Sequence, residues 1–165
     1  MLVNVQDMTG LVLDYAVATA RKLKFEVDVN DWNGYEIMRV HKVDGRPDER
    51  DSFNPSKSKA NGFWVVKELF DMYYTQIDNG TPELPYNITV RCSRESRLDK
   101  GSVPTHYVAY TSKNLVEAAS RCYVALKHGT EMEIPDVYVS HQTTSDAFRK
   151  NLLQQLRNKQ RNEKL

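Results

Sequence analysis

Three arginines are the side chains of this sequence best suited to hold an anion. Arg39 and Arg91 fall on exposed faces of two segments that alternate as strands do, and Arg121 lies at the border of the apolar stripe of a predicted helix. A guanidinium matches a phosphate with two parallel hydrogen bonds, so an arginine at such a position can clamp a phosphate group. An ordinary surface ion pair is the alternative reading for each of them.

A polar loop, FNPSKSK at 53–59, adds further candidates for ligand contacts. It offers the ring of Phe53, the amide of Asn54, the hydroxyl of Ser56 and the ammonium of Lys57. Such a set can hold phosphate or ribose, and the nine tyrosines, five phenylalanines and two tryptophans of the chain supply stacking surfaces. The alternative is an ordinary solvated loop.

The sequence carries no pattern typical of an enzyme or a metal site. Its four histidines fall in four different predicted elements and no two have ligand spacing: His41, His106, His128 and His141. Glycine-rich phosphate loops, a nucleophile elbow and paired-acid motifs do not occur in the sequence. Cys122 sits in the middle of an apolar helical stripe, which favours core packing over a nucleophile. We therefore expect no catalytic residue, no metal and no cofactor.

Composition predicts a globular protein and excludes several classes. Of the 165 residues, 40% are hydrophobic and 27% are charged, near the averages for a single globular domain. No apolar stretch approaches the roughly 18 residues that cross a bilayer, and the opening MLVNVQDMTG has no signal-peptide pattern. The two cysteines, Cys92 and Cys122, show no CxxC spacing. We expect a soluble protein of a reducing compartment, without a membrane partner.

Periodicity predicts an α+β fold in which a small antiparallel sheet packs against two main helices, with a C-terminal amphipathic helix. Thr9 and Ser112 precede two of the helices and are predicted to cap them. The predicted helices lie at 9–24, 60–73, 113–128 and 145–161. The predicted strands lie at 35–43, 86–93 and 106–111, with an edge strand or extended arm at 131–139.

The C-terminal segment differs in character from the rest. Residues 1–140 are predicted to form one α+β domain, and 141–165 a basic helix that extends it. From residue 149 onward six cations face one acid, a net charge of +5 within a chain of net charge +1. Phe148, Leu152 and Leu156 recur every four residues and form a narrow apolar seam. Such a seam suits a partner helix, so the segment predicts a homo-oligomer.

Three ordered segments resemble the NinX-like proteins of tailed phages. The segment AASRCYVALKHGTEMEIP at 118–135 resembles that family's AAMRCYVASKxGDEVEVP signature. MTGLVLDYAVATA at 8–20 is similar to its LTGxxLDWAVA start, and FNPSKSKANG at 53–62 looks like a divergent form of its YSPSTxWxxGG loop. This sequence departs from the pattern in the loop, where Phe53 and Asn54 replace Tyr and Ser and Lys57 replaces Thr.

The resemblance implies a phage protein located in the cytoplasm of the infected bacterium. Some small phage proteins are sponges, which sequester the cyclic nucleotide signals of anti-phage defence without cleaving them. We expect this non-enzymatic function here, with a site that combines Phe53, Asn54, Ser56 and Lys57 with Arg91 and Arg121. Two alternatives remain: a nucleic-acid-associated accessory protein that uses the basic C-terminal helix, and an inhibitor of a host protein.

Overall fold

The computed structural model describes residues 1–32, 35–43, 50–80, 85–94, 107–141 and 143, with the backbone alone described from 28 to 52 and at Asn61. The predicted helix at 145–161, its oligomerisation seam and its basic charge lie outside these residues. The elements follow in chain order: β1 (Leu2–Asn4), the short 3-10 helix η1 (Val5–Asp7), α1 (Gly10–Ala20), β2 (Phe25–Trp32), β3 (Tyr35–Val43), β4 (Arg50–Ser52), α2 (Lys59–Met72), β5 (Tyr74–Asn79), β6 (Ile88–Ser93), β7 (Val108–Ser112), α3 (Leu115–His128) and β8 (Glu131–Glu133).

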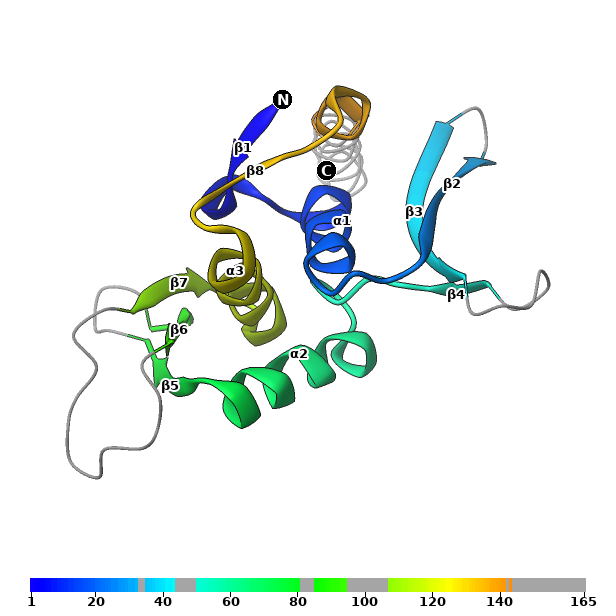
Figure 1. Cartoon of the computed structure of the whole chain (residues 1–165). Helices are drawn as coiled ribbons and strands as arrows, with labels where there is room; N and C mark the ends of the chain where they lie inside the picture. Colours follow the sequence, from blue (N-terminus) through cyan, green and yellow to red (C-terminus); the bar gives the residue numbers. More distant parts are fainter. Residues whose placement is uncertain (33–34, 44–49, 81–84, 95–106, 142, 144–165) are drawn as a thin grey trace, which may run out of the picture.

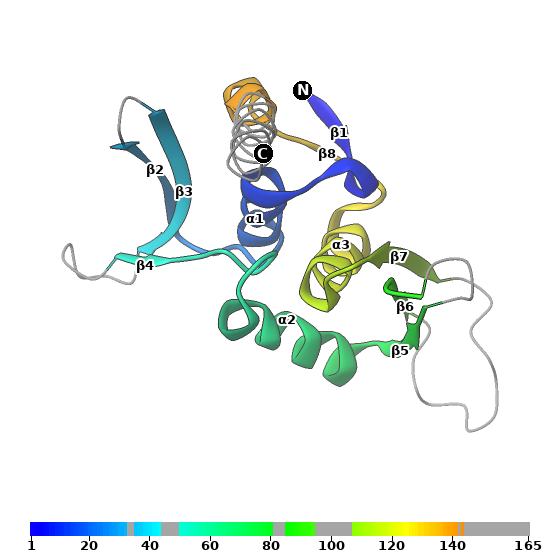
Figure 2. The same cartoon turned by 180° about the vertical axis from the view of Figure 1, so that it is seen from behind.

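The fold class is α+β, as the sequence predicts, with helices lying between sheets. Figures 1 and 2 show α1, α2 and α3 in the middle, with β2–β4 on one side and β5–β7 on the other. α1 contacts β3, and α3 contacts β6 and β7. The helices therefore pack against the sheets on both sides, as a layered fold requires.

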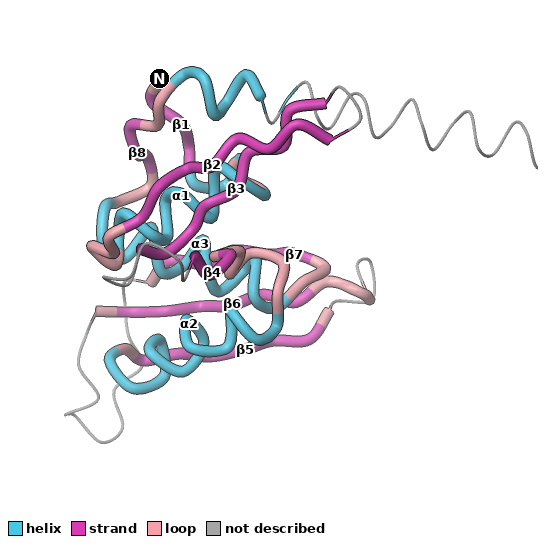
Figure 3. Tube along the Cα trace, turned by 90° about the vertical axis from the view of Figure 1, so that its right-hand side faces the viewer, coloured by secondary structure: helices cyan, strands magenta, loops and turns pink. Residues whose placement is uncertain are grey.

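The described strands form two three-stranded sheets and one two-stranded sheet, all antiparallel. The prediction of a single sheet is wrong in this respect: β3 pairs with β2 and β4, whereas β6 pairs with β5 and β7. β2 and β3 run side by side over their whole length as a hairpin (Figure 3), with Val27 opposite Val40. A turn signal at Asn33-Gly34 favours this local pairing over a distant one.

α3 lies at the centre of the molecule. It contacts α1, α2, β6 and β7, and every residue from Ala118 to Leu126 is buried. Asn114 caps its start, since its side chain accepts a hydrogen bond from the N–H of Val116 at 3.1 Å. The predicted cap, Ser112, instead accepts from the N–H of Asn114. Gly129 ends the helix with a φ of 98°, a conformation that L side chains rarely adopt.

The structure differs from two further predictions, the Thr9 cap and the extended arm at 131–139. Thr9 has the extended backbone of an N-cap, but its side chain makes no capping hydrogen bond to α1. The predicted extended arm at 131–139 is a strand only over β8, which pairs with β1, and a helix begins at Asp136. This pairing brings the start of the chain, 1–4, against the segment 131–134 that follows α3.

At Gly62, α2 lies close to the loop before it and to α3. A Cβ placed there would lie 2.6 Å from the carbonyl oxygen of Pro55 and 2.6 Å from Cβ of Val116. Gly62→Ala is therefore expected to destabilise the protein by about 1–3 kcal/mol, although alanine is the better helix former. Urea unfolding measures this. Ala60→Gly, at an exposed position on the same helix, serves as the control for propensity. A Gly62→Ala protein at least as stable as the wild type would contradict the close contact.

Candidate functional site

The loop 53–58, predicted to bind a ligand, is packed against the protein interior. Phe53 is buried, and its ring stacks on Trp64 with centroids 6.1 Å apart. The carbonyl oxygen of Asn54 accepts hydrogen bonds from the N–H groups of Lys57 and Ser58, which closes a turn. Ser56 is buried, whereas Lys57 is exposed. Of the four predicted residues in this loop, Lys57 is exposed, Asn54 is half-buried, and Phe53 and Ser56 are buried.

Asp14 of α1 and Asn114 before α3 hold this loop in place. Oδ1 of Asp14 accepts a hydrogen bond from the N–H of Ser56 at 2.9 Å, and Nδ2 of Asn114 donates to the Ser56 carbonyl oxygen at 3.2 Å. Asp14 is 6% exposed, and burial raises its pKa to about 6; hydrogen bonding from Ser56 and the charge of Lys57 oppose the shift. The acid within the apolar run LVLDYAVA is the sequence signal for this contact.

Arg121 is buried in α3, although the sequence places it at the border of the apolar stripe. Its Nε donates to the carbonyl oxygen of Met8 at 3.1 Å, and Nη1 donates to that of Thr111 at 3.4 Å. Its Nη2 lies 3.0 Å from Oε1 of Glu117. The guanidinium therefore ties α3 to β7 and to the segment before α1, and these contacts are those of a structural residue. Its role toward a ligand stays a prediction.

Arg91 lies on β6 and is exposed. Its Nε is 3.2 Å from Oδ2 of Asp78 on β5, and its guanidinium carbon lies 5.8 Å from the ring centre of Tyr107. The structure thus places Arg91 on the outer face of the sheet β5–β7, on a different element from the loop 53–58 and from Arg121. The ring of Tyr107 connects Arg91 to the cavity described next.

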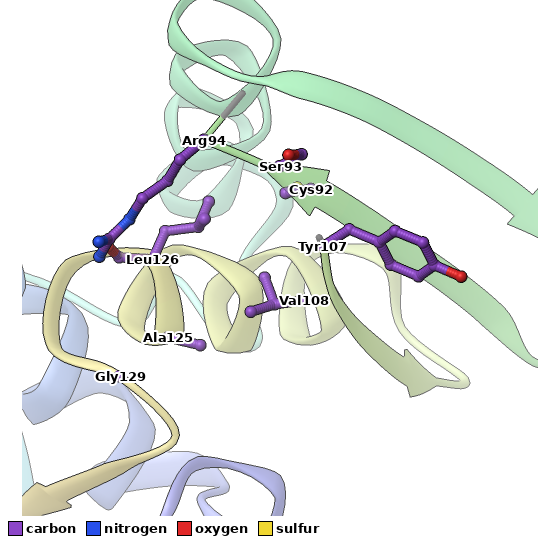
Figure 4. Close-up of a pocket in the computed structure, with 8 residues that line it drawn as sticks. All are labelled: Cys92, Ser93, Arg94, Tyr107, Val108, Ala125, Leu126 and Gly129. Carbon is purple, nitrogen blue, oxygen red and sulfur yellow. The ribbon is translucent and has the colours of Figure 1, made fainter. Parts of the chain in front are cut away.

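A cavity of about 330 Å³ opens between the ends of β6, β7 and α3. Val108, Ala125 and Leu126 give it apolar walls (Figure 4). Arg94 stands at one end and turns toward Leu126, and Tyr107 stands at the other end with its ring directed outward. Cys92 also lines this cavity, from β6. Sequence reasoning missed both residues, because Arg94 begins the charged run 94–104, which looks like a solvated loop, and Tyr107 falls within the predicted strand at 106–111.

The helix end explains why Arg94 lies at this cavity. Its Nη2 donates to the carbonyl oxygen of Leu126, in the last turn of α3, where carbonyl groups lack intrahelical partners. The negative end of the helix dipole also favours a cation there. A guanidinium has five N–H donors on three nitrogens, and this bond uses one of those nitrogens. The cavity therefore has a cation, Arg94, at one end, and at the other end the ring of Tyr107, which is 55% exposed, lies beside its opening.

The described part of the chain was searched for metal sites and for membrane-spanning helices. There, no group of three or more His, Cys, Asp or Glu side chains could hold a metal ion. His128 is exposed and His106 lies outside the described residues. A search of the described residues also finds no helix that is both long and apolar enough to cross a membrane.

Comparisons with known proteins assign this chain to no family. No family model matches the sequence, and no curated protein matches it. The resemblance of 8–20, 53–62 and 118–135 to the NinX-like phage proteins therefore stays a prediction. In the structure two hydrogen bonds join these segments: Asp14 accepts from the N–H of Ser56, and Arg121 donates to the carbonyl oxygen of Met8.

Proposed function

We propose that the protein is a non-enzymatic binding protein that sequesters a nucleotide in the cavity between β6, β7 and α3. The observation that carries the proposal is the pairing, in one cavity, of apolar walls with the guanidinium of Arg94 and the exposed ring of Tyr107. A nucleotide needs both features, because its base is flat and weakly polar while its phosphate is an anion.

The positions of the charges suggest how such a ligand would lie. The base would stack on Tyr107 or enter between Val108 and Ala125, and the phosphate would lie toward Arg94. Arg91, beside Tyr107, adds a second cation at the outer end. A cavity of about 330 Å³ falls at the small end of ligand pockets, so it suits one nucleotide unit. A cyclic dinucleotide would extend over Tyr107 toward Arg91.

The biological setting of the proposal comes from the resemblance to NinX-like phage proteins. On that basis the ligand is a cyclic nucleotide signal of bacterial anti-phage defence, and the protein acts as a sponge in the cytoplasm of the infected host. Sequestration requires binding alone, so the proposal asks for no catalytic group. A homo-oligomer that presents several cavities would raise the number of molecules held per particle.

Tyr107→Ala provides the sharpest test of the cavity. Stacking of a base on an aromatic side chain contributes about 1–3 kcal/mol, so the variant is expected to bind a cyclic nucleotide about 5- to 150-fold more weakly. Isothermal titration calorimetry of the full chain measures this, first with a cyclic mononucleotide and then with cyclic dinucleotides. Tyr86→Ala is the matched control: Tyr86 is 83% exposed and lies before the opposite end of β6.

The outcomes separate the proposed function from its alternatives. Equal weakening by Tyr107→Ala and Tyr86→Ala would place the ligand outside this cavity. Wild-type protein that binds none of the cyclic nucleotides would overturn the proposal. If that protein instead bound duplex DNA with an affinity that falls steeply with salt, the nucleic-acid alternative would replace it.

A further inference from the structure

Two buried cysteines lie beside the cavity, one on β6 and one on α3. Cys92 and Cys122 are free cysteines, and both are 0% exposed. Alternation along β6 places Val90 and Cys92 on the face that packs against α3. Sγ of Cys122, on α3, donates a hydrogen bond to the carbonyl oxygen of Val90 at 3.1 Å. The two cysteines therefore face each other across the contact between strand and helix.

The environment makes the two thiols unequal. The Cys122 thiol lies close to Cys92, and its single S–H can turn from the Val90 carbonyl oxygen to a Cys92 thiolate, which lowers the pKa of the Cys92 thiol. The hydroxyl of Thr75, whose oxygen is 3.6 Å from Sγ of Cys92, acts in the same direction against burial. The same contact with Cys92, together with burial, raises the pKa of Cys122. Cys92 therefore loses its proton first, while Cys122 keeps its own.

The cavity brings a small reagent next to one of the two cysteines. Cys92 belongs to the cavity lining, whereas Cys122 lies behind it on α3 and is absent from that lining. Because Cys92 is fully buried, only a molecule near the size of water can approach its sulfur through local motion of the wall. Hydrogen peroxide has that size, and thiolates are the form of cysteine that it oxidises.

We propose that Cys92 and Cys122 are a modification site at which a peroxide forms an intramolecular disulfide between β6 and α3. The Cys92 thiolate attacks one peroxide oxygen; an S–O bond forms, the O–O bond breaks, and the leaving hydroxide takes a proton to become water. Sγ of Cys122 then attacks the sulfenic sulfur of Cys92. The S–S bond forms, the S–O bond breaks, and the departing hydroxide leaves as water with the proton of Cys122. Two thiols are oxidised, and one peroxide is reduced to two waters.

The disulfide has a measurable consequence for the fold. It links β6 to α3 across 29 intervening residues, and a cross-link of that span restricts the unfolded chain. We expect the oxidised protein to melt on the order of 10 °C higher than the reduced protein, with the shift reversed by dithiothreitol. This inference concerns the thiols alone and does not depend on the nucleotide proposed above.

The test uses the full chain, which contains no other cysteine. Reduced protein is treated with hydrogen peroxide, unfolded, alkylated and weighed by mass spectrometry. The expected product is a monomer that has lost two hydrogens and takes up no alkylating reagent. Under the same conditions Cys122→Ser is expected to stop at a sulfenic or sulfinic acid on Cys92. Cys92→Ser is expected to keep an intact Cys122 thiol, since the cavity does not reach it.

Two results would overturn the inference. The first is wild-type protein whose thiols both remain alkylatable after a peroxide dose that oxidises free glutathione completely. The second is a disulfide that joins two chains, seen as a dimer on a non-reducing gel. A serine variant could fail to fold, which circular dichroism would show. In that case the mass of the oxidised wild-type protein, together with a map of its proteolytic peptides, still shows whether a disulfide joins Cys92 to Cys122.

Discussion

Arg121→Ala is expected to lower the free energy of unfolding by about 3–5 kcal/mol, the range for removal of one partner of a buried ion pair. The variant leaves a cavity in α3, and it removes the Arg121 donors from the carbonyl oxygens of Met8 and Thr111 and from Oε1 of Glu117, whose Oε2 still accepts from the Ser112 hydroxyl. Buried acceptors without partners carry their full desolvation cost. Urea denaturation followed by circular dichroism measures the loss.

Arg91→Ala is the matched control for this variant. Arg91 also pairs with an acid, but its side chain is 44% exposed, so its loss is expected to cost no more than about 1 kcal/mol. Equal losses for the two variants would contradict a structural role for Arg121. The prediction that Arg121 binds a ligand is tested with the same protein, by calorimetry under conditions in which Arg121→Ala is folded. A lower affinity there would bring Arg121 into the site.

Asp14 is expected to make the protein more stable at mildly acidic pH than at neutral pH. Its pKa is about 6 in the folded protein and about 3.9 in the unfolded chain, so the folded state binds the proton more tightly. The resulting stability is fully present below about pH 3.9 and is lost as the pH rises through 6. A difference of roughly two pKa units between the folded and unfolded states changes the free energy of unfolding by about 3 kcal/mol.

Asp14→Asn isolates this contribution from those of the other carboxylates. The asparagine oxygen can still accept the hydrogen bond from the N–H of Ser56, but it carries no charge. We expect the variant to be more stable than the wild type at pH 7.5 and the difference to shrink as the pH falls to 4.5. Urea unfolding at a series of pH values measures it. Asp71→Asn, at an exposed acid of α2, is the control variant. Parallel curves for wild type and Asp14→Asn would contradict the shifted pKa.

Local patterns in the sequence determine most of the elements. The apolar periodicity predicts helices at 9–24, 60–73 and 113–128, and the structure has α1, α2 and α3 within or close to these ranges. The alternating segments predict β3 and the antiparallel pair β6 and β7. These elements can be predicted because they depend on residues close together in the sequence. The spacing of apolar residues distinguishes helix from strand, and turn residues mark where each element ends. Four strands escape prediction: β1, β2, β4 and β5. The turn residues at 78–85 obscure the end of β5.

Tertiary structure decides which side chains can meet a ligand. A helical wheel puts Arg121 at the edge of a stripe, but α3 is enclosed by α1, α2, β6 and β7, so there is no solvent-facing side for it between Ala118 and Leu126. The loop 53–58 looks solvated in sequence, and contacts with Asp14 and Asn114, distant in the chain, draw it inward. Arg94 and Tyr107 lie at one cavity only because β6 ends, and β7 begins, beside the last turn of α3. Burial and proximity arise from packing between elements far apart in the sequence, and no local pattern encodes that packing.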